Sequence, residues 1–179
     1  MNALLWTVTV LGALLALAAL AVALLAVRRC RDLYEVVSRR TARGPVLPEA
    51  GTPVPPTRVV TVDGAVVDLA ERGEDERVLA FLTTDCPACE ELAGGLRRAL
   101  AALPAGAPRP LVVVSGGAAG RAVHVRDFAP VAHVADADGR HPLADALGVT
   151  AFPTVLVVSE GRVRRAGHGL AQAGLEAVR

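Results

Sequence analysis

Lysine is absent from the chain, and all nineteen positively charged side chains are arginines. Eighteen carboxylates balance them, so the net charge is +1. A nucleic-acid-binding domain instead carries a basic patch that neutralises phosphates. The charge balance therefore excludes a nucleic-acid scaffold, and we expect no nucleic-acid partner.

Cysteine and aromatic residues are also scarce. The three cysteines, Cys30, Cys86 and Cys89, cannot form the two or more intrachain bridges of a small disulfide-rich protein. Aromatic residues make up only 3% of the chain, whereas hydrophobic residues make up 53%. The chain is too apolar for a disordered protein, and its core must be packed from valine, leucine and alanine.

Charge is missing from one long stretch, Ala3 to Val27. As a helix, at about 1.5 Å per residue, it would exceed the ~30 Å hydrocarbon core of a bilayer. No Arg precedes it and Arg28 and Arg29 follow it, which favours a retained anchor over a cleaved signal peptide. We predict a transmembrane anchor over residues 1–27, which crosses the membrane once through residues 3–27.

Residues 28–57 are predicted to form a juxtamembrane helix and a tether. The helix can continue to Arg40, before Gly44 and Pro45 end it. The tether favours an extended polyproline conformation because it contains five prolines: Pro45, Pro48, Pro53, Pro55 and Pro56. The domain that follows can then work at some distance from the bilayer.

Residues 58–179 are predicted to be one α/β domain around a central sheet. The pattern begins with a hairpin, residues 59–62 and 66–69, joined by Asp63 and Gly64. Apolar runs predict buried strands, and helical spacing predicts helices between them. The expected order is strand 77–83, helix 86–102, strand 111–115, helix 118–128, strand 131–134, helix 142–147, hairpin 154–158 with 162–166, and helix 170–178.

The motif Cys86-Pro87-Ala88-Cys89 lies directly after a buried strand, at the start of a helix. A helix start provides free N–H donors and a positive partial charge that stabilise the thiolate of the first cysteine. In this context C-x-x-C indicates a redox-active dithiol. The alternatives are a structural disulfide and half of a metal site completed by histidines from the set His124, His133, His141 and His168.

A second motif, Gly148-Val149-Thr150-Ala151-Phe152-Pro153-Thr154, follows about sixty residues later. Together the two motifs resemble the thioredoxin superfamily. The resemblance implies a cis bond before Pro153, beside the cysteines, and a Phe152 backbone free to pair with a substrate segment. It implies Cys86 and Cys89 as the catalytic pair, and substrate contacts at Phe152, Pro153, Pro87 and Ala88.

The resemblance covers residues 50–179 and is narrower than the superfamily. The hairpin and the back half of the domain are similar to the membrane-anchored TlpA/ResA-like thiol:disulfide oxidoreductases. The layout of anchor, tether and hairpin is also similar to the methylamine utilization protein MauD family, which implies a role in methylamine dehydrogenase maturation. We therefore expect a thioredoxin-like fold with an extra N-terminal hairpin, preceded by one transmembrane helix.

Several residues depart from the family pattern. The tryptophan that commonly precedes C-x-x-C is replaced by Thr84-Asp85, and the buried carboxylate of thioredoxin is replaced by Ala80. Asp85, Glu90 and Glu91 surround the dithiol, either as a solvated helix start or as an acidic docking rim. A peroxidase is a weak alternative, because Leu79 stands where peroxiredoxins have a proline before T-x-x-C.

These features predict a membrane-tethered thiol:disulfide oxidoreductase that needs no cofactor or metal beyond the redox-active Cys86–Cys89 pair. Its partners would be cysteine-containing proteins and a membrane redox protein that reloads the dithiol. The alternatives are a cytochrome c maturation reductase and a non-catalytic binding or chaperone module. Six arginines after the span favour a cytoplasmic domain, but exposed disulfide chemistry favours an extracytoplasmic one, which we expect.

Overall fold

The computed structural model describes residues 47–70 and 73–175. The predicted anchor over residues 1–27 lies outside them, as does the predicted juxtamembrane segment up to residue 46. Within the described ranges, no helix is long and apolar enough to cross a membrane.

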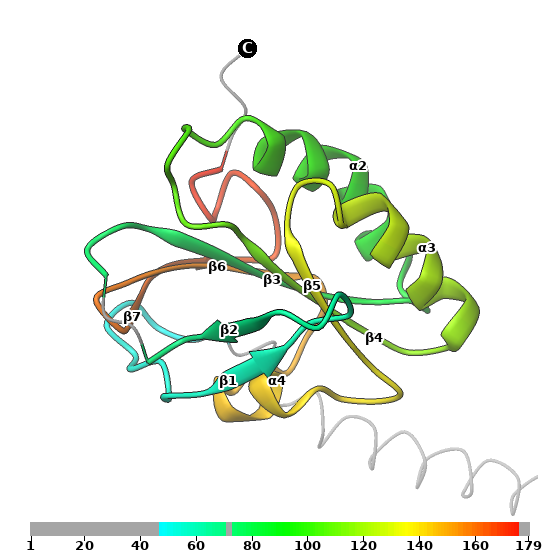
Figure 1. Ribbon diagram of the computed structural model, residues 1–179, viewed down its shortest axis with the longest axis horizontal. Coiled ribbons are helices and arrows are strands. Elements are labelled where there is room, and N and C mark those ends of the chain that lie inside the picture. Colours follow the sequence, from blue (N-terminus) through cyan, green and yellow to red (C-terminus); the bar gives the residue numbers. More distant parts are fainter. Residues whose placement is uncertain (1–46, 71–72, 176–179) are drawn as a thin grey trace, which may run out of the picture. The chain divides into compact units, whose positions relative to one another are not determined.

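A five-stranded mixed sheet, ordered β5-β4-β3-β6-β7, forms the centre of the domain (Figure 1). Its strands are β3 (Arg77–Thr83), β4 (Leu111–Ser115), β5 (His133–Ala137), β6 (Thr154–Ser159) and β7 (Arg162–Gly167). The first three are parallel, and β6 and β7 are antiparallel to their neighbours. Parallel pairing requires crossovers, which are α2 (Pro87–Ala101) and α3 (Ala118–Phe128), whereas α4 (Pro142–Ala146) joins β5 to β6.

Both faces of the sheet are covered, as the apolar runs predict. In β3, Leu79 and Phe81 point into one core cluster, with the N-terminal hairpin and α4. Ala80 and Leu82 point into the other cluster, with α2 and α3. Figure 1 shows α2 and α3 on one side of the sheet and the hairpin with α4 on the other. Because β3 is buried on both faces, its sequence is apolar without alternation.

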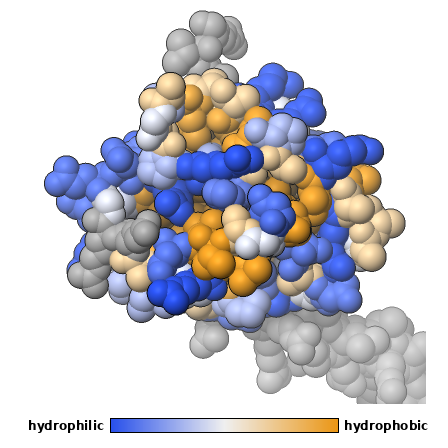
Figure 2. Space-filling view, viewed as in Figure 1, coloured by the Kyte–Doolittle hydropathy of each residue, from blue (hydrophilic) through white to orange (hydrophobic). Residues whose placement is uncertain are grey.

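The predicted N-terminal hairpin is confirmed as β1 (Arg58–Val60) paired antiparallel with β2 (Val66–Asp68). Gly64 in its turn has φ 81°, a conformation that glycine adopts without strain. Val59 and Val67 are buried against the sheet, whereas Val60 is 67% exposed. Figure 2 shows hydrophobic surface at the centre of this face, where the hairpin lies.

Two predicted elements have different bounds. The strand predicted over 131–134 is β5 at His133–Ala137. The chain leaving α3 first makes a turn in which the N–H groups of Val131 and Ala132 both donate to the Phe128 carbonyl. The helix predicted over 170–178 is only a turn within the described residues, and it ends at Gly174, whose φ is 69°.

The last part of the predicted tether is packed rather than free. Pro48 and Val54 are buried. The Gly51 N–H donates to the Val163 carbonyl at 2.7 Å, and the Val163 N–H donates to the Thr52 carbonyl at 2.9 Å. The prolines in this segment prevent a regular strand, but they leave enough free N–H groups for it to line the β7 edge.

Candidate active site

The C-x-x-C motif lies where β3 ends and α2 begins. Cys86 is the N-cap of α2, with φ −139° and ψ 103°, and Pro87 is the first helical residue. Proline suits this position because its missing N–H would have no intrahelical partner there. Pro87 and Ala88 are exposed, so the outer surface of the motif is open to a second protein.

Cys86 presents its sulfur at the helix start. The side chain is half-buried, and its Sγ accepts a hydrogen bond from the Cys89 N–H at 3.2 Å. The same sulfur lies 3.6 Å from the Phe152 carbonyl oxygen, to which the protonated thiol donates. The Cys86 sulfur is therefore accessible and is held between a backbone donor and a backbone acceptor.

Cys89 differs from Cys86 in its surroundings. It is 0% exposed and belongs to the core cluster beneath α2. Burial raises the pKa of the Cys89 thiol to about 12, with further contributions from the Cys86 side chain and the Glu90 charge. Both cysteines of the motif are free thiols in this structure.

The loop before β6 brings the second motif to the cysteines. β6 pairs antiparallel with β3, with Thr154 opposite Phe81, so residues before Thr154 lie beside residues that follow β3. The Phe152–Pro153 bond is cis, as the thioredoxin resemblance implies. The structure thus brings four predicted site residues together: Cys86 and Cys89 from the start of α2, and Phe152 and Pro153 from the loop before β6.

The three carboxylates that the sequence places around the dithiol lie at the surface. Asp85, Glu90 and Glu91 are all exposed. Ala80 is fully buried in β3, so no carboxylate lies beneath the cysteines at that position. Solvent screens the three exposed charges more than it would a buried one.

Solved structures resemble this domain, among them the three that follow, although no family model and no curated protein matches the sequence. A secreted Mycobacterium tuberculosis disulfide oxidoreductase, homologous to E. coli DsbE, has a TM-score of 0.56 and 19% identity, covering 69% of this chain and 96% of that chain. The thioredoxin domain of a Bacteroides vulgatus thiol-disulfide oxidoreductase has a TM-score of 0.52 and 13% identity, covering 64% of this chain and 85% of that chain. StoA from Bacillus subtilis has a TM-score of 0.52 and 16% identity, covering 64% of this chain and 90% of that chain. The fold is thioredoxin-like.

In this thioredoxin-like fold, sequence analysis missed two residues that hold the site. Thr84 lies against the β4–α3 loop, where its hydroxyl accepts a hydrogen bond from the Gly117 N–H at 3.0 Å. His168 follows β7, and its Nδ1 lies 2.7 Å from the Pro153 carbonyl oxygen. The sequence feature that could have indicated these contacts is the glycines beside them, at 116–117 and at 167 and 169.

The metal alternative finds no support among the described residues. They contain no group of three or more His, Cys, Asp or Glu side chains placed to hold a metal ion. The four histidines lie on different elements. They are His124 in α3, His133 in β5, His141 at the start of α4 and His168 after β7.

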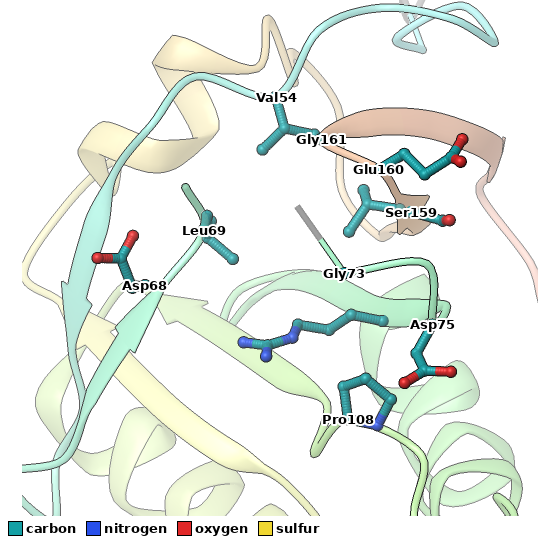
Figure 3. Close-up of a pocket in the computed structure, with 11 residues that line it drawn as sticks. Val54, Asp68, Leu69, Gly73, Asp75, Pro108, Ser159, Glu160 and Gly161 are labelled. Carbon is teal, nitrogen blue, oxygen red and sulfur yellow. The ribbon is translucent and has the colours of Figure 1, made fainter. Parts of the chain in front are cut away.

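A cavity of about 220 Å³ lies at the opposite end of β3 from the cysteines (Figure 3). Arg77, the first residue of β3, contributes to its lining, whereas Cys86 follows the last residue of that strand. Val54 and Leu69 line the cavity from the N-terminal segment, and Ser159 and Glu160 line it from the β6–β7 turn. The cavity therefore does not belong to the dithiol site.

Proposed function

We propose that this chain is a membrane-tethered thiol:disulfide oxidoreductase that acts on protein disulfides through Cys86 and Cys89. The observation that carries the proposal is the placement of the Cys86 sulfur. It lies at a helix start, 3.2 Å from the Cys89 N–H and 3.6 Å from the carbonyl of Phe152, the residue before the cis-proline. A sulfur so placed can be reached by a partner strand that pairs with the Phe152 backbone.

The reducing direction proceeds in two exchanges. The Cys86 thiolate attacks one sulfur of the partner's disulfide, a mixed disulfide forms, and the partner's other sulfur leaves as a thiolate and takes up a proton. Cys89 then loses its proton and attacks the Cys86 sulfur, releasing the partner's second thiolate. Two electrons pass to the partner, and a Cys86–Cys89 disulfide remains. The oxidising direction reverses these steps, and no cofactor or metal takes part.

The different burial of the two sulfurs supports different roles for them. A buried thiol whose pKa is about 12 has little thiolate at neutral pH, so Cys89 does not begin the reaction. Cys86 is half-buried and therefore makes the first attack. Cys89 reacts only when the partner is already bound to the adjacent sulfur.

Trapping of mixed disulfides tests this division. The full chain with Cys89→Ser, expressed in its native membrane, should accumulate mixed disulfides through Cys86, whereas Cys86→Ser should accumulate almost none. Both variants should carry Cys30→Ser, so that only the dithiol contributes. Equal trapping by the two variants, or none by either, would contradict the proposal.

The alternative from another class is a non-catalytic binding or chaperone module. Such a module needs neither thiol, so its activity would survive Cys86→Ser. Reduction of insulin disulfides by the full chain, lost in Cys86→Ser, supports the oxidoreductase. Unchanged suppression of aggregation by Cys86→Ser, with no insulin reduction by the native chain, would favour the module.

The narrower role that we propose is maturation of methylamine dehydrogenase, with cytochrome c maturation as the alternative. The layout of anchor, tether and hairpin supports the first, and the β1–β2 hairpin is present in the described residues. Deletion of the chain should abolish methylamine dehydrogenase activity while c-type cytochromes keep their covalent haem. The reverse pattern would support the alternative.

We also propose that a membrane redox protein reloads the dithiol. After each round the Cys86–Cys89 pair is in the wrong oxidation state for the next partner, so a second thiol exchange must restore it. Exposed Pro87 and Ala88 leave room for that exchange at the same sulfur.

A further inference from the structure

His168 is placed by the sheet beside the loop that carries the cis-proline. Val155 in β6 pairs with Gly167 in β7, so the residue after Gly167 lies opposite the start of β6. From there the His168 Nδ1 comes within 2.7 Å of the Pro153 carbonyl oxygen. A carbonyl only accepts, so Nδ1 carries the proton and donates this bond.

The backbone of His168 is itself held in place. Its N–H donates to the Gln172 Oε1 at 2.8 Å, within the turn that follows β7. A Cβ on Gly167 would lie 2.4 Å from the Gln172 Cβ, so the chain runs tightly past this turn. The backbone of His168 is therefore fixed, and this fixes the position from which its imidazole donates to the Pro153 carbonyl.

The rest of the ring makes no polar contact. The His168 Nε2 is buried and has no hydrogen-bond partner among the described residues. Among the residues that the structure describes, the bond from Nδ1 to the Pro153 carbonyl is thus the one polar interaction of this side chain. That pattern fits a side chain whose role depends on one nitrogen, Nδ1.

The loop between α4 and β6 is consequently fixed from two sides. The Thr154 hydroxyl donates to the Ala151 carbonyl at 2.8 Å, before the cis bond, and His168 donates to the Pro153 carbonyl after it. Between these two bonds lies Phe152, whose carbonyl oxygen is 3.6 Å from the Cys86 sulfur. The orientation of the Phe152 backbone therefore depends on both bonds.

We propose that His168 is a positioning residue for protein substrates: by holding the Pro153 carbonyl, its Nδ1–H aligns the Phe152 backbone with which a partner strand pairs before its sulfur reaches Cys86. This inference rests on the proposed oxidoreductase function. It predicts that His168 affects disulfides presented by a polypeptide and not small disulfides, which need no backbone pairing.

The test is single-turnover oxidation of the reduced full chain, in a Cys30→Ser background, by insulin and by hydroxyethyl disulfide. His168→Asn keeps an N–H at the position of Nδ1, whereas His168→Gln places it at the position of Nε2, and His168→Ala removes it. We expect Gln and Ala to raise the half-saturating insulin concentration by about two- to tenfold, the range for one net hydrogen bond. Asn should restore it, and the rates with hydroxyethyl disulfide should not change.

A control variant is His133→Asn, on β5 at the end of the sheet far from the cysteines, which should behave as the native chain. Equal insulin kinetics in all His168 variants would overturn the inference, and so would a loss that is equal for insulin and for hydroxyethyl disulfide, because that indicates a general structural role. If neither insulin nor hydroxyethyl disulfide oxidised the native chain, the proposed function would be refuted, and this inference with it.

Discussion

The raised pKa of Cys89 depends in part on the neighbouring Cys86 side chain. Burial is the main cause of its raised pKa, but the Cys86 side chain contributes both a hydrogen bond and a charge. A mixed disulfide at Cys86 removes both contributions, because the sulfur then carries neither charge nor proton. In the proposed mechanism, the Cys89 thiol therefore becomes easier to ionise once the partner is bound at Cys86.

This coupling can be measured in the full chain with Cys30→Ser. Cys86→Ala should lower the pKa of Cys89 below about 12, while burial keeps it above the ordinary 9.0. Glu90→Gln should lower it by a smaller amount, because the Glu90 charge is a minor cause. The thiolate absorbance in the ultraviolet, followed against pH, reports the change. Glu91→Gln is the matched control, and a Cys89 pKa unchanged by Cys86→Ala would refute the coupling.

Thr84 fills the space that two glycines leave open next to the active-site loop. A Cβ on Gly120 would lie 2.7 Å from the Thr84 Cβ, and one on Gly116 would lie 2.2 Å from its Oγ1. Both distances are shorter than a nonbonded contact allows. Thr84 lies two residues before Cys86, and its side chain therefore connects the active-site segment to the start of α3.

Gly120→Ala should accordingly destabilise the domain by about 1–3 kcal/mol, the usual cost of overpacking. Gly94→Ala is the matched control, since Gly94 lies within α2 with nothing near its Cβ position. It should stabilise the domain by roughly 0.5–1 kcal/mol, because alanine loses less backbone entropy in a helix. Thermal unfolding of both variants, followed by circular dichroism, measures the difference. Equal effects of the two substitutions would rule out the packing role of Thr84.

At the scale of elements, the short helix α4 is stabilised by hydrogen bonds at both of its ends. The His141 Nδ1 accepts a hydrogen bond from the Leu143 N–H at 3.1 Å, which caps the first turn. At the other end, the Gly148 N–H donates to the Asp145 carbonyl and the Val149 N–H donates to the Ala144 carbonyl. This pattern closes the helix around Gly148, whose φ is 66°, and directs the chain into the loop that carries Phe152.

The His141 cap should make stability depend on pH. Burial lowers the pKa of His141 below its ordinary 6.5, although the Asp136 charge opposes the shift. The unfolded chain then takes up the proton at a higher pH than the folded chain, so the free energy of unfolding falls as pH drops below 6.5. A protonated Nδ1 also ceases to accept the bond from Leu143.

His141→Asn should flatten this dependence, because the asparagine oxygen caps the helix and does not titrate. Chemical unfolding of both chains from roughly pH 7 to 5 should show a steeper decline for the native chain. His133→Asn, which removes another histidine whose pKa burial lowers but leaves the cap in place, is the comparison variant. An identical slope in His141→Asn and the native chain would disprove the role of the cap.

At the scale of the whole domain, the N-terminal segment makes backbone hydrogen bonds to both edges of the central sheet. The Val62 N–H, beyond β1, donates to the Val134 carbonyl in β5 at 2.8 Å. At the other edge, Val54 donates to the Gly161 carbonyl and Gly51 donates to the Val163 carbonyl. An edge with unpaired backbone groups can pair with other chains, and these hydrogen bonds reduce the number of unpaired groups at each edge.

The location of the domain can be tested on whole cells. We expect Cys86 to lie outside the cytoplasm, where exposed disulfide chemistry persists. In a Cys30→Ser background, a membrane-impermeant maleimide should label intact cells that carry the full chain, and Cys86→Ser should abolish most of the signal because Cys89 is buried. Labelling only after lysis would place the domain in the cytoplasm, as the arginines that follow the predicted span suggest.

Much of the fold could be predicted because its signals are local. β3 and β4 have the predicted bounds because their apolar runs are continuous, and the turn before β7 follows from Glu160 and Gly161, which both have positive φ. β5 was misplaced because its last residues, Asp136 and Ala137, lack a strand pattern. They join the sheet only through pairing with β4.

The order of helices and strands, the hairpin, and the two motifs that carry Cys86 and Pro153 can be predicted from the sequence, because hydrophobic periodicity and turn residues act between near neighbours. Which distant groups meet depends instead on how the strands assemble. The contact between Cys86 and Phe152, and that between His168 and Pro153, follow from the order and register of β3, β6 and β7. The hydrophobic pattern and a short turn can set the register of adjacent strands such as β6 and β7, but no turn joins β3 to β6, so their register is set only when the sheet assembles.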